Sequence, residues 1–336
     1  MRNKIVALLF LILILTLSVC NNKKPEKEEK SVLTEKKSII VPVFMADSAY
    51  HYIREQVDFG PRVPNTPPHL YCGNYLIEKF RNYAAEVQVQ DFQQTAYNGE
   101  MLNLRNIIAS FNPDNSRRIL LAAHWDTRPV ADKDSIRTDV PIDGANDGAS
   151  GVGVLMEIAR VISMYPLENI GVDIILFDGE DYGEPESYPG QATPEPGNTW
   201  WCLGSQYWSV NKHKPRYMAY YGILLDMVGA ENAEFHMEGV SMMYAEKVVE
   251  KVWSTAAQLG YREFFIPQRS PEITDDHVFI NRDARIPTIN IVDYDPFNQN
   301  SYFPSYHHTH ADNISIIDKN TLKAVGQTLL QVLYHE

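Results

Sequence analysis

Cysteine is scarce in this sequence, with 3 residues in 336, at positions 20, 72 and 202. No two of them have Cys-x-x-Cys spacing, which argues against a zinc site built from thiolates. Two interpretations of Cys72 and Cys202 stay open: they form a disulfide after export, or they are two buried free thiols.

Two common hydrolase motifs are also missing. The chain has no H-E-x-x-H segment, the helical zinc motif of many metalloproteases. Around Ser150 the sequence is GASGVG, with Val152 where G-x-S-x-G requires its last glycine. Serine hydrolysis on a nucleophile elbow is therefore rejected, and the glycines from Gly148 to Gly153 are interpreted as positions of close packing.

Basic residues are too few to balance the acids, and the formal net charge is −13. Residues 1–38 carry an excess of lysine and arginine, so the rest of the chain is more acidic still. An acidic body argues against nucleic acid as a partner. Solubility is the default explanation for this acidity.

The one strongly apolar run near the start, Ile5 to Val19, follows Arg2 and Lys4 and is short for a membrane span. It ends in LSVC, which resembles a bacterial lipoprotein signal with Cys20 as the lipidated residue, although Val19 stands where a small residue is expected. Residues 1–20 are therefore predicted to be a lipoprotein-type signal, with a simple secretory signal or an uncleaved anchor as alternatives. The polar segment 21–38 is predicted to be a flexible tether. We expect export to the bacterial periplasm with a lipid anchor.

Hydrophobic residues make up 44% of the chain, enough for a packed core. Beyond residue 38, continuous apolar runs typical of buried strands alternate with segments of helical periodicity. This alternation predicts an α/β fold, a three-layer α/β/α sandwich around a mixed, mostly parallel sheet. Asn98-Gly99 predicts a hairpin turn, and the segment 183–198 is too rich in proline and glycine for regular structure. The expected strands are 87–97, 102–111, 117–126, 171–180, 220–230 and 286–294, and the expected helices are 47–60, 69–86, 147–163, 241–260 and 321–335.

Acids and histidines follow the predicted strands at the edge where ligands bind in parallel α/β sheets. Singly, each has a structural explanation: Asp147 as a helix cap, Asp226 as a turn residue, His124 as a core histidine. Together, clustered carboxylates would repel one another unless they bind a cation or a proton, and carboxylate with imidazole favours zinc. The clustered residues are His124, Asp126, Asp143, Asn146, Asp147, Asp178, Glu180, Asp181, Asp226, His307, His308, His310 and Asp312.

The adjacent acids Glu180 and Asp181 suggest a division of labour. Neighbouring residues at a strand end point to opposite sides. One carboxylate is thereby able to bind a metal while the other stays free as a general acid and base. The alternative is an ordinary acidic turn.

Five segments, AAHWDTRP, DGANDGASGVGVLMEIAR, ILFDGEDYG, LLDMVGA and YHHTHADNISIID, occur in the order found in zinc-dependent aminopeptidases of the phosphorylase/hydrolase-like fold. Residues 45–336 resemble more closely that superfamily's glutaminyl-peptide cyclotransferase branch, through FDGED, DDHVFI, a tryptophan after the acidic loop, and DFGPRVPNTPPH. The resemblance implies a single zinc-dependent catalytic domain over 39–336. The implied zinc ligands are Asp147, Asp181 and His308, the acid/base is Glu180 with Asp226 and Asp276 as its partners, and the pocket wall is Trp200 or Trp201.

Two residues depart from the animal cyclases that the chain resembles. Asp181 stands where those enzymes have a second glutamate, and Asn290 stands where they have a histidine. The shorter Asp181 side chain requires a shift of backbone or metal. At Asn290, the proton relay would have to be built differently.

The resemblance implies an enzyme that converts the N-terminal Gln of peptides or proteins to pyroglutamate and ammonia, with one zinc as Lewis acid. We expect a monomer with no nucleic-acid partner, since the acidic charge argues against one. An aminopeptidase with one or two zinc ions is the alternative, because the five residue types of a dinuclear site are also present. A non-catalytic peptide-binding protein of the envelope is a third hypothesis, which Glu180 argues against. The dinuclear set would be His124, Asp147, Asp181, Asp226 and His308.

Overall fold

The computed structural model describes residues 39–185, 187–188, 190, 194–298 and 302–336. The predicted signal with Cys20 and the predicted tether lie outside the described residues and stay predictions. Residues Ile39–Glu336 form one unit by their contacts. None of the described helices combines the length and apolar character needed to cross a bilayer.

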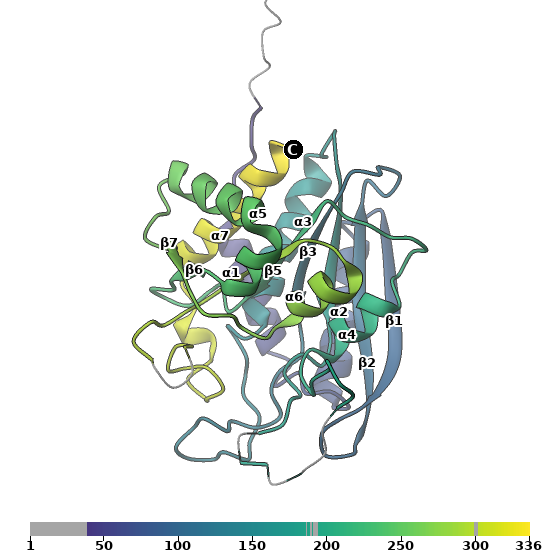
Figure 1. The fold of residues 1–336 in the computed structure, drawn as a ribbon, viewed down its shortest axis with the longest axis vertical. Helices are drawn as coiled ribbons and strands as arrows, with labels where there is room; N and C mark the ends of the chain where they lie inside the picture. The colour runs from purple at the N-terminus through teal and green to yellow at the C-terminus, as the bar shows by residue number, and fades with distance from the viewer. Residues whose placement is uncertain (1–38, 186, 189, 191–193, 299–301) are drawn as a thin grey trace, which may run out of the picture. The chain divides into compact units, whose positions relative to one another are not determined.

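Six strands of the described chain form a mixed central sheet. They are β1 (Glu86–Thr95), β2 (Met101–Phe111), β3 (Arg118–His124), β4 (Gly171–Phe177), β5 (Tyr221–Asp226) and β8 (Thr288–Val292). Their order is β1-β2-β4-β3-β5-β8 (Figure 1). Strands β4, β3, β5 and β8 are parallel, whereas β2 is antiparallel to both β1 and β4. The predicted hairpin is confirmed, with Thr95 opposite Met101 across a turn in which Gly99 has a φ of +83°.

The central strands are buried on both faces, as their continuous apolar runs predicted. In β3, Ile119, Leu121 and Ala123 join one apolar cluster and Leu120 and Ala122 join another, because successive side chains of a strand point to opposite faces. The confirmed three-layer sandwich follows from this alternation. On the first face pack α1 (Ala46–Val57), α2 (Pro67–Arg81), α3 (Ala149–Met164), α5 (Gly239–Gln258) and α7 (Lys319–Tyr334); on the second pack α4 (Leu203–Val210) and the π-helical turn Ile280–Ala284.

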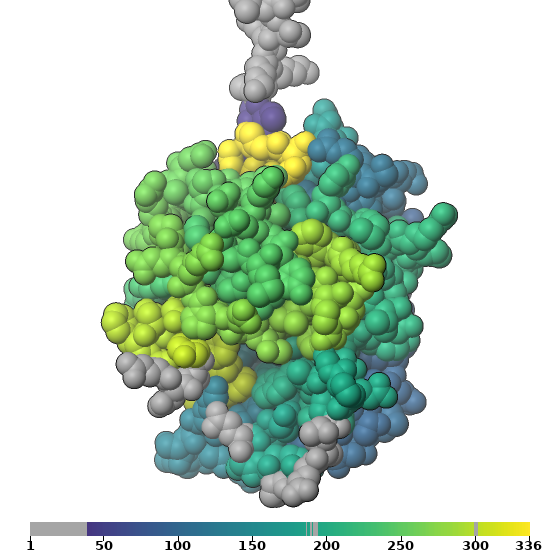
Figure 2. All heavy atoms as spheres, viewed as in Figure 1, coloured from purple at the N-terminus to yellow at the C-terminus, as the bar shows by residue number. Residues whose placement is uncertain are grey.

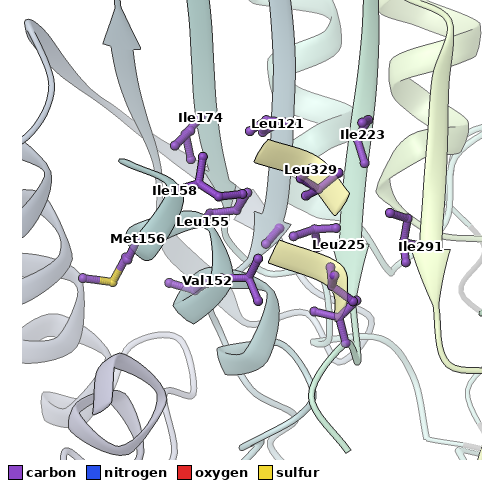
Figure 3. Close-up of a cluster of buried hydrophobic side chains, with 14 of the residues drawn as sticks. Leu121, Val152, Leu155, Met156, Ile158, Ile174, Ile223, Leu225, Ile291 and Leu329 are labelled. Atoms are coloured by element: carbon purple, nitrogen blue, oxygen red, sulfur yellow. The ribbon is translucent and has the colours of Figure 1, made fainter. Parts of the chain in front are cut away.

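Helix α3 is the central helix of the first face. Its Val152 and Leu155 point toward the sheet, near Leu225 of β5 and Leu329 of α7 (Figure 3). Glycine at 151 is needed there, because a Cβ would lie 2.5 Å from the carbonyl oxygen of Leu225. Close packing of this helix fixes where its first turn, and the loop before it, meet the sheet.

Several described elements were not predicted from the sequence. They are α4, β6 (Phe235–Met237), β7 (Phe265–Arg269), which pairs with β6 in a parallel two-stranded sheet, the short helix α6 (Asp276–Phe279), and the turns Ile280–Ala284 and Ile314–Ile316. The predicted helix 69–86 is shorter at its end, since α2 stops at Arg81 and β1 begins at Glu86. The described part of 183–198 holds no helix or strand, as expected.

The parallel strands all start at one end of the body and finish at the other. Arg117, just before β3, and Tyr221, at the start of β5, both hydrogen-bond to Glu336. The yellow end of α7 and the purple start of the described chain lie together at this same end (Figure 2), where the side-chain amide of Gln327 donates to the carbonyl of Pro42. The carboxyl ends of β3, β4 and β5 therefore meet at the far end, where the predicted site residues lie (Figure 1).

Candidate metal centre and active site

Three side chains predicted to bind metal converge at the carboxyl edge of the sheet. Asp181 follows β4, Asp147 precedes α3, and His308 comes from the segment before α7. The Nε2 atom of His308 lies 3.2 Å from Oδ1 of Asp181 and 3.8 Å from Oδ2 of Asp147. All three are buried, with exposed fractions of 6% for His308, 1% for Asp181 and 3% for Asp147.

This trio fits a zinc ion. Neither oxygen of the buried Asp181 carboxylate accepts a hydrogen bond from a described residue, which is costly unless a cation meets it. Ligand atoms about 2.0–2.1 Å from a tetrahedral zinc lie roughly 3.3 Å apart, close to the separation of His308 and Asp181. Two carboxylates and one imidazole would give a bound zinc three protein ligands, the number typical of catalytic zinc sites.

Two further carboxylates hold the backbone of these ligands in place. Asp126, just after β3, accepts hydrogen bonds from the backbone N–H groups of Glu180 and Asp181, both at 3.1 Å. Asp312 accepts from the N–H groups of Asn146, at 2.7 Å, and Asp147, at 3.1 Å. Each acid therefore fixes the direction of one ligand-bearing loop.

Asp132 and Arg128 lie on the other side of the predicted metal ligands. Oδ1 of Asp132 lies 3.7 Å from Nδ1 of His308, the nitrogen turned away from the trio. Arg128, fully buried, donates two hydrogen bonds to Asp132 and one to the carbonyl of Asp181. A carboxylate behind a ligand histidine fixes its ring orientation and raises its basicity. The sequence analysis missed both residues, whose only sequence signal is an Arg-Asp pair at i, i+4 beside His124.

His124 and Asp226 lie on the opposite side of Asp147. Nε2 of His124 lies 2.9 Å from Oδ1 of Asp147 and 3.3 Å from Oδ1 of Asp226. The first distance is that of a charge-assisted hydrogen bond. Glycine at 148 is needed beside this contact, because a Cβ there would collide with the imidazole of His124. These three side chains also form one of the described clusters whose atoms are close enough to share a cation.

His307 approaches Asp147 without being a suitable ligand. Its ring stacks on that of His308, with centroids 3.6 Å apart. Lys133 lies 3.0 Å from Nδ1 of His307, and because an ammonium only donates, Nδ1 accepts and the ring proton is on Nε2. That Nε2 lies 3.9 Å from Oδ2 of Asp147. The histidine is thus a structural neighbour of the trio.

Glu180 lies beside the trio and outside it. Burial raises the pKa of Glu180 well above its usual range, and the carboxylates of Asp275 and Asp181 raise it further. A raised pKa suits a group that both takes and returns a proton near neutral pH. Asp226 is also affected, since burial raises its pKa to about 7.

The predicted partner Asp276 requires a correction. Asp276 is fully buried and does not line the pocket, whereas its neighbour Asp275 does. Asp275 caps α6 and is extended, with a φ of −160°, while Asp276 is already the first helical residue. Oδ2 of Asp275 accepts a 2.6 Å hydrogen bond from Nδ2 of Asn290. Asn290, the residue that stands in place of a histidine, therefore fixes the orientation of the Asp275 carboxylate.

The trio opens into a cavity of about 250 Å³, which Glu180, Asp226 and Asp275 also line. Trp201 forms one wall, its ring parallel to that of His308 with centroids 5.7 Å apart. Arg128 covers the ring of Trp201 at 4.4 Å. Trp200 lines a separate hollow with Leu203 and Tyr207. Of the two predicted tryptophans, the structure places Trp201 at the site.

The sequence matches peptidase family M28 over residues 106–333. The glutaminyl-peptide cyclotransferase of Drosophila melanogaster is 26% identical over 299 residues, which cover 80% of this chain and 76% of that protein. The solved glutaminyl cyclase of Bacteroides thetaiotaomicron, bound to N-acetylhistamine, is 54% identical, with a TM-score of 0.84 over 88% of this chain and 100% of that one. A solved Zn-dependent exopeptidase of Parabacteroides distasonis is 50% identical, with a TM-score of 0.85 and the same coverage.

Proposed function

We propose, from the premise that this chain belongs to peptidase family M28, that it is a glutaminyl-peptide cyclotransferase. It converts the N-terminal Gln of peptides or proteins to pyroglutamate and releases ammonia. The observation that carries the proposal is the placement of Glu180 beside the zinc-binding trio in a pocket walled by Trp201. At about 250 Å³ the cavity is smaller than the roughly 300–1,000 Å³ typical of sites for drug-sized ligands, which suits one terminal residue.

Asp147, Asp181 and His308 would hold a zinc ion, which would supply a Lewis acid for the γ-carboxamide of the substrate. Glu180 accepts a proton from the α-amino group, whose nitrogen then attacks the γ-carbonyl carbon. Glu180 returns that proton to the departing nitrogen, which leaves as ammonia when the bond from carbon to nitrogen breaks. Both reacting groups belong to one residue, so the pocket has only to hold its folded rotamer. The indole of Trp201 excludes water that would compete.

One zinc rather than two is part of the proposal. The 2.9 Å contact between His124 and Asp147 is shorter than the roughly 3.3 Å separation of two ligand atoms on one tetrahedral zinc. A hydrogen bond there makes His124 a partner of the ligand Asp147. Zinc binding as such follows from the family and its zinc-dependent members.

The aminopeptidase alternative rests on the same residues. There, Glu180 would take a proton from water that attacks the first peptide bond. This reaction agrees with the peptidase family M28 and with the solved structure of a Zn-dependent exopeptidase. The two reactions differ in product, so one assay separates them.

The protein from Ile39 onward is expected to release ammonia from Gln-Ala and to leave Ala-Ala intact. Ammonia is measured by a coupled assay, the blocked N-terminus by mass spectrometry, and zinc by elemental analysis, with about one ion expected per chain. The control peptide Asn-Ala has the same amide on a side chain one methylene shorter. Release of free alanine from Ala-Ala together with two zinc ions per chain would overturn the proposal.

We also propose that the full chain is a monomer held in the bacterial cell envelope, on its periplasmic side, by a lipid on Cys20. The support for export and the lipid anchor is the charged-then-apolar start of the sequence and its LSVC ending. Full-length protein is expected in the membrane fraction and the Cys20→Ser variant in the soluble periplasmic fraction. A wild-type protein found in the soluble periplasmic fraction would contradict lipidation.

A further inference from the structure

Cys202 is the residue where the chain turns back onto the acidic strand end. It precedes α4 with a left-handed backbone, at a φ of 57°. Its N–H donates to the carbonyl of Glu180 at 2.9 Å, and the N–H of Leu203 donates to the carbonyl of Gly179 at 3.1 Å. These two hydrogen bonds connect the start of α4 to the turn that carries Glu180.

The thiol of Cys202 continues this attachment on the side chain of Glu180. Sγ lies 3.2 Å from Oε1 of Glu180, within hydrogen-bond distance for sulfur. Among the described residues, no other hydrogen bond reaches the Glu180 carboxylate. Cys202 is fully buried, and a carboxylate oxygen of Asp275 lies within 4.8 Å of the thiol and of Glu180.

In this contact the thiol is the hydrogen-bond donor and the Glu180 carboxylate is the acceptor. Burial raises the pKa of the Cys202 thiol well above its usual range, and the carboxylate of Glu180 raises it further, so the sulfur keeps its proton. A thiol is a weak donor. It therefore orients a carboxylate while reducing its basicity less than a hydroxyl would.

We propose that Cys202 is a positioning residue: its S–H holds Oε1 of Glu180, which leaves Oε2 to exchange the substrate proton. The proposal rests on the function proposed above. A carboxylate adjacent to the ligand Asp181 is otherwise free to turn toward the cation and become a further ligand. The thiol opposes this rotation from the side of α4 and keeps Glu180 a base.

The test compares Cys202→Ala with Cys202→Ser. The alanine variant is expected to lose about tenfold in kcat for Gln-Ala, less than the ~10²-fold cost of a 1 Å misplacement of reacting groups, with KM changed less than about twofold. Zinc content and melting temperature are expected to match the wild type, since Glu180 is no ligand. The serine variant keeps a donor and is expected to recover to within about threefold of the wild-type kcat. Cys72→Ala, at the other buried free thiol, is the matched control and should keep wild-type kinetics.

Two results would overturn the proposal. One is a Cys202→Ala variant with wild-type kcat. The other is equal loss in the alanine and serine variants together with lost zinc or a lower melting temperature, which marks a packing role. If Cys202→Ala does not fold, a serine variant that folds with zinc yet falls tenfold or more in kcat also counts against it. If the wild type proves to be an aminopeptidase, the same ratios measured on Ala-Ala still test the contact, because Glu180 is the base in both reactions.

Discussion

Glu180→Gln is expected to lower kcat for Gln-Ala by about 10³-fold, within the ~10²–10⁴-fold range of general acid–base catalysis. The amide has nearly the shape of the carboxylate and does not take up the amine proton. Because Glu180 lies outside the trio of Asp147, Asp181 and His308, zinc content should not change. Because the pKa of Glu180 is raised by burial, removing its charge should leave the melting temperature equal or higher. Steady-state kinetics, elemental analysis and thermal denaturation measure these three quantities.

Glu246→Gln is the matched control for this variant. Glu246 lies on α5, is exposed, and pairs with Arg269 on the surface. Its change removes the same charge and is expected to leave kcat within about twofold, as for surface substitutions generally. Wild-type turnover in Glu180→Gln would contradict the acid–base role of Glu180. Loss of zinc in that variant would show instead that Glu180 is a ligand.

The central strands were predictable from the sequence, because a strand that is buried on both faces consists of a continuous run of apolar residues. The continuous apolar runs of β3 and β4 predict strands covered by helices, and Asn98-Gly99 predicts the hairpin. The parallel sheet β6–β7 was missed, because β6 has three residues, too few for a periodicity to be seen. A strand this short is set by its neighbours rather than by its own pattern.

Site residues were predictable where they end strands and uncertain where two similar residues adjoin. Asp275 and Asp276 differ only in which is the cap and which begins α6, and that boundary decides which carboxylate reaches the pocket. Trp200 and Trp201 pose the same problem. Gly183 leaves room for Trp201, since a Cβ there would collide with its indole. Contacts between distant segments settle both choices, and a single sequence does not contain them.

The acidic site makes the zinc-free protein sensitive to pH. Burial raises the pKa of Asp226 to about 7, and raises that of Asp181 well above its usual range. An acid with a raised folded-state pKa binds its proton more tightly when folded, so stability is lost as the pH rises toward that pKa. The histidines of the unfolded chain have a pKa of about 6.5, so they are half protonated at pH 6.5 and neutral by pH 8.5. Against the effect of burial, hydrogen bonds to Asp126, Asp147 and Asp226 raise the pKa of His124 well above its usual range, so the stability that His124 contributes to the folded state is also lost as the pH rises. The lowered pKa of Asp147 acts only at acidic pH. The groups with raised pKa therefore lower the stability across this window.

After zinc is removed with a chelator, the melting temperature is expected to fall by at least about 5 °C from pH 6.5 to 8.5. One acid that stays protonated when folded costs about 1.4 kcal/mol per pH unit, and each kcal/mol shifts the melting temperature by roughly 2–4 °C in a large domain. Zinc favours the ionised carboxylates, so its stabilisation should be larger at pH 8.5 than at pH 6.5. Asp181→Asn removes one of these charges, and its zinc-free form should melt higher than the zinc-free wild type at pH 8.5 and gain little from added zinc. A zinc-free wild type whose melting temperature is flat across this window would mean that the buried carboxylates do not repel as the geometry requires.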